Sequence, residues 1–509
     1  MSKPSRRPNR EAAKEARKQL KEKVKQSRKE LLKIQAEDGI VVPHQVSVSN
    51  ALCSYKSVEE EQVAREEAVA AQVAVYRAIL PLLLRRFSNI ADPRNPKKVK
   101  HKLTVLLMYG LLIFVFQMAS RREANQVMSR PAFFGTLKLL FPELETMPHS
   151  DTLERLLARI DIQKIELLIV EIFTSFTRKK KFVKFLISKC YPIAVDGTQK
   201  SVRDGDNWPD EWQRRIFHLK EGEKTQSYLY VLEANLVLRN GLTLPLLSEF
   251  VSHIEGDPDD CKQDCELKAF YRLAKRLKTY FPRLPIMILL DGLYPNGPLM
   301  AQCHAYNWQF MIVLPDECLS SVWKDVDARL MDRSIDELEN IWKGRKQYFW
   351  WTNDIKYIYD GKEINLNVVV CREAYNVVDN NGDIIEQIKN HVWISSHPLS
   401  KENVHERCNL GARFRWGIES SNLTEKHGGY NYEHIFSYDW NAMKGYHYLM
   451  RLAHMLNAIA LLTKRVAKQV RTMGIRAFLK FVRDTCANRW LRPEWISELL
   501  SARFQFRFA

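Results

Sequence analysis

The sequence predicts an α/β protein, with a mixed sheet that carries a β-rich insertion and is preceded and followed by helical regions. Three observations lead to this fold class. Two apolar runs of strand length end in an acidic residue, at Asp196 and Asp291, as buried strands of α/β sheets often do. Asn240-Gly241 separates two further strand-like runs and is a strong hairpin signal. Long segments on both sides repeat their apolar residues at helical spacing.

Length, charge and cysteine content bound the organisation. A chain of 509 residues is too long for one ordinary core, so roughly two to four modules are expected. The net charge of +18 and the pI near 9.4 predict a polyanionic partner. The nine cysteines are odd in number and scattered, which indicates a reducing compartment without a disulfide framework.

Residues 1–45 form a basic arm. The first 35 residues hold thirteen Lys and Arg against four Glu, with too few apolar side chains to bury a core. The arm is expected to be flexible or a charged helix that contacts phosphates non-specifically. A solubilising tail is the alternative reading of the same composition.

Residues 60–180 have a helical pattern. Residues 63–84 form an Ala- and Val-rich amphipathic run. Residues 103–119 are the one candidate membrane span in the sequence, but they are shorter than about 20 residues and contain Thr104 and Gln117. A buried core helix is therefore expected there, and no membrane association is predicted.

The segment 190–320 alternates strands and helices. A first strand (191–196) precedes a hairpin, a helix, the strand that ends at Asp291, a second helix and a last strand. The predicted elements after the first strand are 227–238, 242–251, 261–280, 284–291, 297–308 and 309–314. The cations Lys200, Arg203, Arg214 and Arg215 would lie in a connection beside Asp196, where they suit a DNA backbone or form an ordinary charged loop.

Residues 321–400 read as a β-rich insertion, and residues 441–509 read as helical. The predicted strands of the insertion are 347–351, 355–359, 364–372 and 391–396, with turns at Asp360-Gly361 and around Gly382. Neighbouring strand residues face opposite ways, so Trp350 or Trp351 would face solvent, where a flipped base could stack, or else pack in a core. The apolar stripe that begins at Leu449 would cover the core or join two protomers.

Between these segments, residues 401–440 contain a short run that concentrates charge. If residues 413–426 are helical, Arg415, Glu419 and Lys426 point the same way. A salt-bridged surface face is the simplest interpretation of one acid between two bases. Asp196 and Asp291 at strand ends favour another: three carboxylates from two strands and a helix can hold two Mg²⁺ ions, while Arg415 and Lys426 hold phosphates.

These residues resemble the D-D-E catalytic core of bacterial insertion-sequence transposases with an RNase H-like fold. Arg415, Glu419 and Lys426 match the R-x3-E-x6-K spacing of the Y-R-E-K signature in that group. The signature tyrosine would fall on Ala412, which departs from the pattern. The resemblance covers roughly residues 190–460. It implies a core in two parts, 190–320 and 401–440, around the insertion, and a helical DNA-binding region before it that recognises terminal inverted repeats.

The resemblance implies a DNA transposase that uses two Mg²⁺ or Mn²⁺ ions bound by Asp196, Asp291 and Glu419. Such an enzyme nicks the ends of its element and joins the resulting 3′-OH to target DNA. It also implies a homodimer that holds two double-stranded ends, in the nucleoid region of a bacterial cytoplasm. Two alternatives remain open: a metal-dependent nuclease without strand transfer, and a non-catalytic relic that only binds DNA.

Overall fold

The computed structural model describes residues 7–37, 53, 55–219, 222–252, 265–502 and 504–508. The chain is a mixed α/β protein, with fifteen α-helices and ten strands among these residues. It divides into two compact units, each described by itself. The larger unit comprises Ser47–Leu290, Tyr306–Trp308 and Asn409–Ala509, and the smaller unit comprises Met1–Val46, Asp291–Ala305 and Gln309–Cys408.

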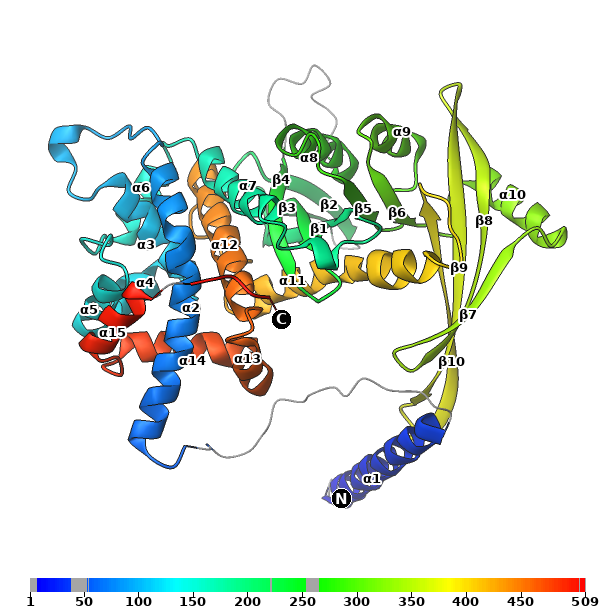
Figure 1. Ribbon diagram of the computed structural model, residues 1–509, viewed down its shortest axis with the longest axis horizontal. Coiled ribbons are helices and arrows are strands. Elements are labelled where there is room, and N and C mark those ends of the chain that lie inside the picture. Colours follow the sequence, from blue (N-terminus) through cyan, green and yellow to red (C-terminus); the bar gives the residue numbers. More distant parts are fainter. Residues whose placement is uncertain are drawn as a thin grey trace. The chain divides into compact units, whose positions relative to one another are not determined.

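The larger unit holds most of the helices, which surround the helix α12 (Trp440–Leu461). Helix α12 packs against α2, α3, α6 and α7 and against the strand β4 (Figure 1), and it is buried on nearly all sides. The helices of this unit are α2 (Val58–Phe87), α3 (Leu103–Val115), α4 (Arg121–Met128), α5 (Pro131–Leu140), α6 (Ser150–Leu157), α7 (Gln163–Arg178), α8 (Glu266–Tyr280), α11 (Trp416–His427), α12, α13 (Ala467–Met473), α14 (Ile475–Ala487) and α15 (Pro493–Ser501), with short 3₁₀ turns η1 (Pro96–Lys98), η2 (Val183–Phe185) and η4 (Ala412–Arg415).

The first helices of the larger unit confirm the helical pattern of the sequence. Ser57 caps α2 by accepting from the Glu60 amide, as N-cap serines do. The apolar run 103–119 forms the buried helix α3 (Leu103–Val115). Among the described residues, α2 is the one helix long and apolar enough to cross a membrane, and 56% of its apolar window is buried inside the protein.

Five strands of the larger unit are arranged around β3. Strand β3 pairs antiparallel with β1 on one side, while β2 and β4 pair with successive parts of its other edge, and β1 pairs parallel with β5. The predicted hairpin is confirmed, because β3 and β4 are joined at Asn240-Gly241, where Gly241 has a φ of 87° that favours glycine. The strands are β1 (Tyr191–Asp204), β2 (Gln213–Leu219), β3 (Gly222–Val237), β4 (Thr243–Val251) and β5 (Ile286–Leu290).

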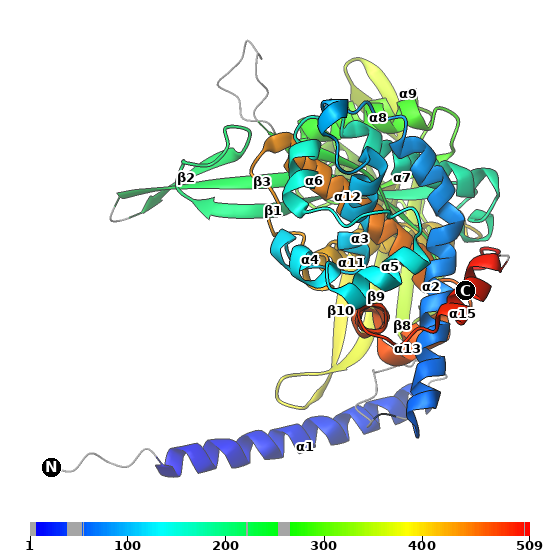
Figure 2. The ribbon, with the colours of Figure 1, turned by 90° about the vertical axis from the view of Figure 1, so that its left-hand side faces the viewer.

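The first predicted strand is longer in the structure than in the sequence analysis. Residues 197–204, predicted as a connection, continue β1, and β2 was not predicted. These parts of β1, β2 and β3 project as a ribbon beyond the neighbouring helices (Figure 2). The side chains here are mostly polar or charged, and those of β2 and the start of β3 are mostly exposed, so they lack the apolar pattern of a buried strand. The ladder hydrogen bonds to β3 determine their conformation.

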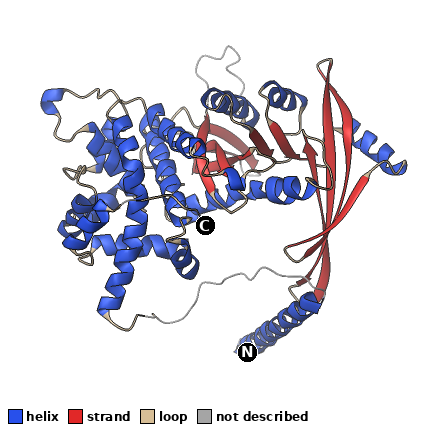
Figure 3. Cartoon of the chain, viewed as in Figure 1, coloured by secondary structure: helices blue, strands red, loops and turns tan. Residues whose placement is uncertain are grey.

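The smaller unit is built on an antiparallel ribbon with the strand order β6-β10-β9-β8-β7, which includes long strands drawn in red (Figure 3). Positive φ angles of 49° at Asp360 and 69° at Gly361 form the predicted turn between β8 and β9. The ladder between these strands is irregular between Thr352 and Ile355, so the two strands predicted there form one. The elements are β6 (Gln309–Val313), β7 (Asp336–Trp342), β8 (Arg345–Tyr359), β9 (Lys362–Val378), β10 (Ile384–Ser395), α1 (Arg7–Glu37), α9 (Gly297–Ala305) and α10 (Ser320–Met331). The π-helix η3 (Glu406–Gly411) spans the point where the chain returns to the larger unit.

Two predictions on the smaller unit have clear outcomes. The described part of the basic arm, residues 7–37, is the long helix α1, which packs against β9; the rest of the arm lies outside the described residues. Ser27 Oγ donates to the Gly382 carbonyl at 2.6 Å, and Lys23 lies 3.0 Å from the Asp383 carboxylate. In β8, Trp351 is buried and Trp350 is half-buried, which follows the alternation of a strand.

Candidate active site

Asp196 lies where β1 leaves the core of the larger unit. The preceding residues 193–195 are fully buried, and Asp196 is half-buried. In the parallel ladder between β1 and β5, Ala194 stands opposite Leu289. Asp196 and Asp291 therefore each follow a paired position by two residues along neighbouring parallel strands. The carboxyl ends of such strands are where α/β sheets place their chemistry.

Asp291 follows the last residue of β5 directly and is the point where the chain passes into the smaller unit. Its Oδ1 accepts from the Leu293 amide at 2.9 Å, and its carbonyl accepts from the Tyr294 amide. A side chain that bonds the backbone two residues on forms a local turn. This turn fixes the aspartate at the end of its strand.

Glu419 is carried by α11, which packs against β1, β3 and β4. The approach is close because the second residue of the helix is a glycine: a Cβ on Gly417 would lie 3.0 Å from Thr243 Oγ1 and 3.2 Å from a Val237 methyl. The turn η4, which leads into α11, also packs against β1 and β5. The larger unit thus brings together the helix that carries Glu419 and the strand that carries Asp196.

Arg415 and Glu419 form an ion pair at one helical turn. Arg415 donates to Glu419 Oε1 at 2.9 Å, with side-chain exposures of 8% and 35%. The guanidinium also lies 5.0 Å from the centre of the Trp416 ring. This is the salt bridge that the simpler interpretation of the sequence describes, and it leaves Glu419 as the more exposed partner.

Lys426 is paired at the other end of the helix. Its ammonium lies 3.3 Å from Glu433 Oε1, and the side-chain exposures are 19% and 57%. Ala412, which takes the place of the signature tyrosine, is buried in η4. The role of Lys426 and Arg415 in phosphate binding is not tested by these contacts.

The sequence analysis did not predict a buried charge cluster between β3, α11 and α12. The cluster consists of Glu233, Glu425, His447, Arg451 and His454. Arg451 lies 3.0 Å from Glu233 and 2.9 Å from Glu425, so one guanidinium joins β3 to α11. His454 lies 2.6 Å from Glu425, and His447 lies 3.3 Å from Glu233. All of these side chains are nearly or fully buried. Polar residues inside the otherwise apolar α12 were the signal that could have revealed the cluster.

The cluster compensates the charge of one of the two acids, Asp196 and Glu233, that face each other across the β1–β3 ladder. Asp196 stands directly opposite Glu233, and such pairs point to the same face of a sheet. Burial raises the pKa of Glu233, but Arg451 and His447 outweigh burial and hold this pKa below its usual range. Arg451 and His454 do the same for Glu425. The charge of Glu233 is therefore compensated by Arg451 and His447. Asp196 is the more exposed acid of the pair.

Lys200 corrects one expectation. The sequence placed it in a basic connection, but it is a buried residue of β1. Its ammonium donates to the Tyr432 carbonyl at 2.8 Å and lies 4.2 Å from the Tyr432 ring centre. Burial lowers its pKa to about 8, against the opposing effect of Glu233 and Glu425. Lys200 therefore belongs to the interior and not to a DNA-facing loop.

A further carboxylate, Glu266, lies close to β1 but on the other face of the sheet. A Cβ on Gly197 would approach Glu266 Oε2 to 2.6 Å and overlap the Tyr230 hydroxyl, and Tyr230 donates to Glu266 at 2.8 Å. Successive strand residues face opposite ways, so Glu266 is separated from Asp196 by the sheet. Within the described parts of the chain, no group of three His, Cys, Asp or Glu is arranged to hold a metal ion.

A family model matches part of the chain. The family model described as DDE_Tnp_1-associated matches residues 84–171, which run from the end of α2 into α7. No curated protein matches the chain. The match points to a DDE-type transposase family and a transposase-related function. It covers an associated region and does not include Asp196, Asp291 or Glu419.

Proposed function

We propose that the chain is a DNA transposase with an RNase H-like core, in which Asp196, Asp291 and Glu419 form the catalytic site. The observation that supports the proposal is the parallel register of β1 and β5, in which Ala194 pairs with Leu289, so that each aspartate follows a paired position by two residues. Helix α11, with Glu419, packs against the first of these strands. The family match is independent support, because it covers residues 84–171 and so does not depend on any of the three acids.

The donor set suits a hard divalent cation, because carboxylate oxygens are the ligands that Mg²⁺ prefers. Asp196 and Asp291 would hold the ions, and Glu419 would complete the site once its bond to Arg415 gives way. When bound, two Mg²⁺ or Mn²⁺ ions activate an attacking oxygen and stabilise charge on the leaving oxygen. Arg415 is the buried member of this ion pair and Glu419 the more exposed one, so the exchange leaves the guanidinium in need of another anion, which a DNA phosphate would supply.

The protein side chains would position the DNA. Arg415, released from Glu419, would face the phosphate that the reaction attacks, and Lys426 would hold a neighbouring phosphate. Water would be the nucleophile when the element end is nicked, and the resulting 3′-OH would attack a target phosphodiester in the second reaction. The partners are two double-stranded element ends held by a homodimer, and target DNA in the bacterial cytoplasm.

The second candidate is a metal-dependent nuclease with the same site. It shares the first reaction and lacks the joining reaction. A relic that only binds DNA is the third candidate, and the retained positions of Asp196 and Asp291 at paired strand ends favour the catalytic interpretations over it.

The test incubates the purified chain with labelled DNA that carries the ends of its own element, with Mg²⁺ or Mn²⁺ and then with EDTA. Metal-dependent nicks at the ends, followed by joining to target DNA, are expected. Asp196→Asn, Asp291→Asn and Glu419→Gln should each reduce nicking by about 1000-fold, which is roughly 4 kcal/mol of activation free energy. All three should retain DNA binding.

Glu266→Gln is the matched control. It removes an acid of α8 that lies against the opposite face of β1, and nicking should be unchanged. Equal loss in Glu266→Gln and Asp196→Asn would contradict the assignment of the site. Nicks without joined product would support the nuclease, and binding without any metal-dependent nick would support the relic.

A further inference from the structure

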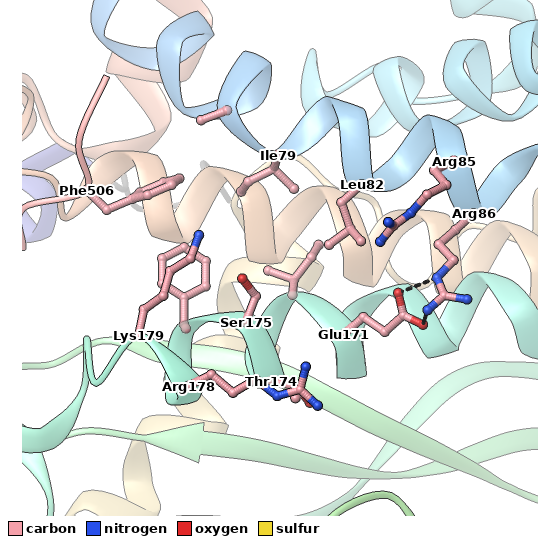
Figure 4. A pocket seen from close by; sticks show the side chains of 13 residues that line it. Ile79, Leu82, Arg85, Arg86, Glu171, Thr174, Ser175, Arg178, Lys179 and Phe506 are labelled. Atoms are coloured by element: carbon pink, nitrogen blue, oxygen red, sulfur yellow. Dashed lines mark hydrogen bonds and ion pairs between the residues drawn. The ribbon is translucent and has the colours of Figure 1, made fainter. Parts of the chain in front are cut away.

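A groove lies between α2, α7 and the C-terminal segment of the larger unit, and none of the three candidate carboxylates lines it (Figure 4). Its volume is about 520 Å³. The floor is apolar, with Ile79, Ile172 and Phe176 buried beneath it. Phe506 forms one wall and contacts Phe176 edge to face, with ring centres 4.8 Å apart. The groove therefore offers apolar surface to whatever enters it.

The rim of the groove is positively charged. Arg85, Arg86, Arg178 and Lys179 line it together with one acid, Glu171. Glu171 is occupied by Arg86, whose Nε donates to it at 2.6 Å. Arg85, Arg178 and Lys179 are exposed, and none of them has an ion pair with another described residue. Three cations on the rim are therefore uncompensated.

The positive charge continues beyond the groove. Residues 178–189 contain six Lys and Arg and no acid. One of them, Lys181, donates to the Phe506 carbonyl at 3.1 Å and so attaches the C-terminal wall to this segment. Cations near the last turns of α2 and α7 also suit the helix dipoles, but each such contact contributes only about 0.3–1 kcal/mol. The dipoles do not account for a run of this length beside an apolar groove.

The distribution of charge distinguishes among anionic ligands. Arg85 and Arg86 lie at one end of the groove, and Lys179 lies at the other, next to Phe506 (Figure 4). Cations at both ends with an apolar floor between them suit a chain of phosphates joined by sugars better than a single small anion. Contacts to phosphate and sugar position a protein on DNA without reading its sequence.

We propose that this groove binds a stretch of DNA backbone, with phosphates on Arg85, Arg178 and Lys179 and deoxyribose against the apolar floor. That the polyanion is DNA rests on the proposed function. It adds a positioning site on α2 and α7 that is separate from the carboxylates. Binding at this site is independent of metal and of base sequence.

The experiment compares two triple variants of the full chain by fluorescence anisotropy with labelled duplex DNA in EDTA. One variant is Arg85→Gln/Arg178→Gln/Lys179→Gln. The other, Lys268→Gln/Lys275→Gln/Arg283→Gln, removes three exposed cations from α8 and the segment that follows it. The groove variant should bind more weakly, and its log Kd against log salt slope should be shallower by about 2 to 3, since each phosphate contact contributes about 0.9. The control variant should keep the slope of the unaltered chain.

Two unrelated duplex sequences should lose affinity by the same factor in the groove variant. Equal slopes in the two triple variants, at unchanged melting temperature, would overturn the proposal. Loss of binding to anionic lipid vesicles, with DNA binding intact, would also overturn it. Because binding is measured without metal, failure of the catalytic proposal appears separately, as absent nicking with Mg²⁺ by a chain that still binds DNA through the groove.

Phe506→Ala tests the wall of the groove. It should weaken DNA binding a few-fold and leave the salt slope unchanged, because it removes apolar contact and no charge. An unaltered affinity would remove the sugar contacts from the proposal.

Discussion

Two groups of charged residues in the larger unit share β1, β3 and α11 but differ in burial. Glu233, Glu425 and Arg451 are buried and bound to one another through a single guanidinium. Asp196 and Glu419 lie one position across the ladder and less than two helical turns along α11 from the two buried acids, yet both are partly exposed. The paired strands β1 and β3, and likewise the helix α11, therefore carry one acid that is buried and fixes their packing and one that is partly exposed.

The largest expected difference between the two groups is in stability. Arg451→Met leaves two buried carboxylates without their shared cation, and breaking a buried pair in this way costs about 3–5 kcal/mol. Arg415→Met breaks a partly exposed pair at i,i+4 and should cost less than about 1 kcal/mol. Urea unfolding of both variants measures the difference. Similar losses in the two variants would erase the distinction between the groups.

The response to acid should sharpen the comparison. Glu233 and Glu425 have lowered pKa values in the folded chain, so their contribution to stability is complete above their unfolded value and is lost as the pH falls below it. Each contributes a slope of up to about 1.4 kcal/mol per pH unit in that range. Unfolding free energies measured from pH 5 to pH 3 should fall less steeply in Glu233→Gln. A slope equal to that of the unaltered chain would place the acid sensitivity elsewhere.

The smallest expected effect on stability concerns Lys426 of α11. Lys426→Ala should change stability by no more than about 1 kcal/mol, because its partner Glu433 is exposed. If Lys426 holds a phosphate, binding to element ends should weaken and the salt slope should become shallower by about 1. Anisotropy titrations at several salt concentrations test this. A slope that does not change would leave Lys426 as a partner of Glu433 alone.

Much of the fold could be predicted because its signals are local. The hairpin at Asn240-Gly241, the turn at Asp360-Gly361 and the strand before Asp291 each follow from a few neighbouring residues, and the structure confirms them. Strand β7 (Asp336–Trp342) was missed, since its sequence is acidic and half-exposed. Its conformation depends on pairing with β8, which lies beyond the reach of local propensity. The RNase H-like assignment stays a prediction.

The candidate site divides in the same way. The positions of Asp196 and Asp291 at the ends of strands followed from the apolar runs before them. The partner of Glu419 followed from helical spacing, since Arg415 lies one turn away. Lys200 was placed on the surface because its neighbours are polar, and only the packing of Tyr432 shows that it is buried. The burial of Arg451 was not predicted. The apolar stripe on α12 indicates one buried face, whereas the structure buries almost the whole helix, including Arg451.

Glu419 and Glu425 lie on the same helix, α11, but mutations at these two positions would inactivate the protein in different ways. A copy that mutates Glu419 loses an exposed carboxylate and keeps the connection from Glu425 through Arg451 to Glu233. On the proposed function, its product would still fold and bind DNA, and it would compete with active copies for the same element ends. A copy that mutates Glu425 or Arg451 would be removed by proteolysis instead. Inactive descendants that persist as repressors should therefore carry lesions at the first acid and not at the second.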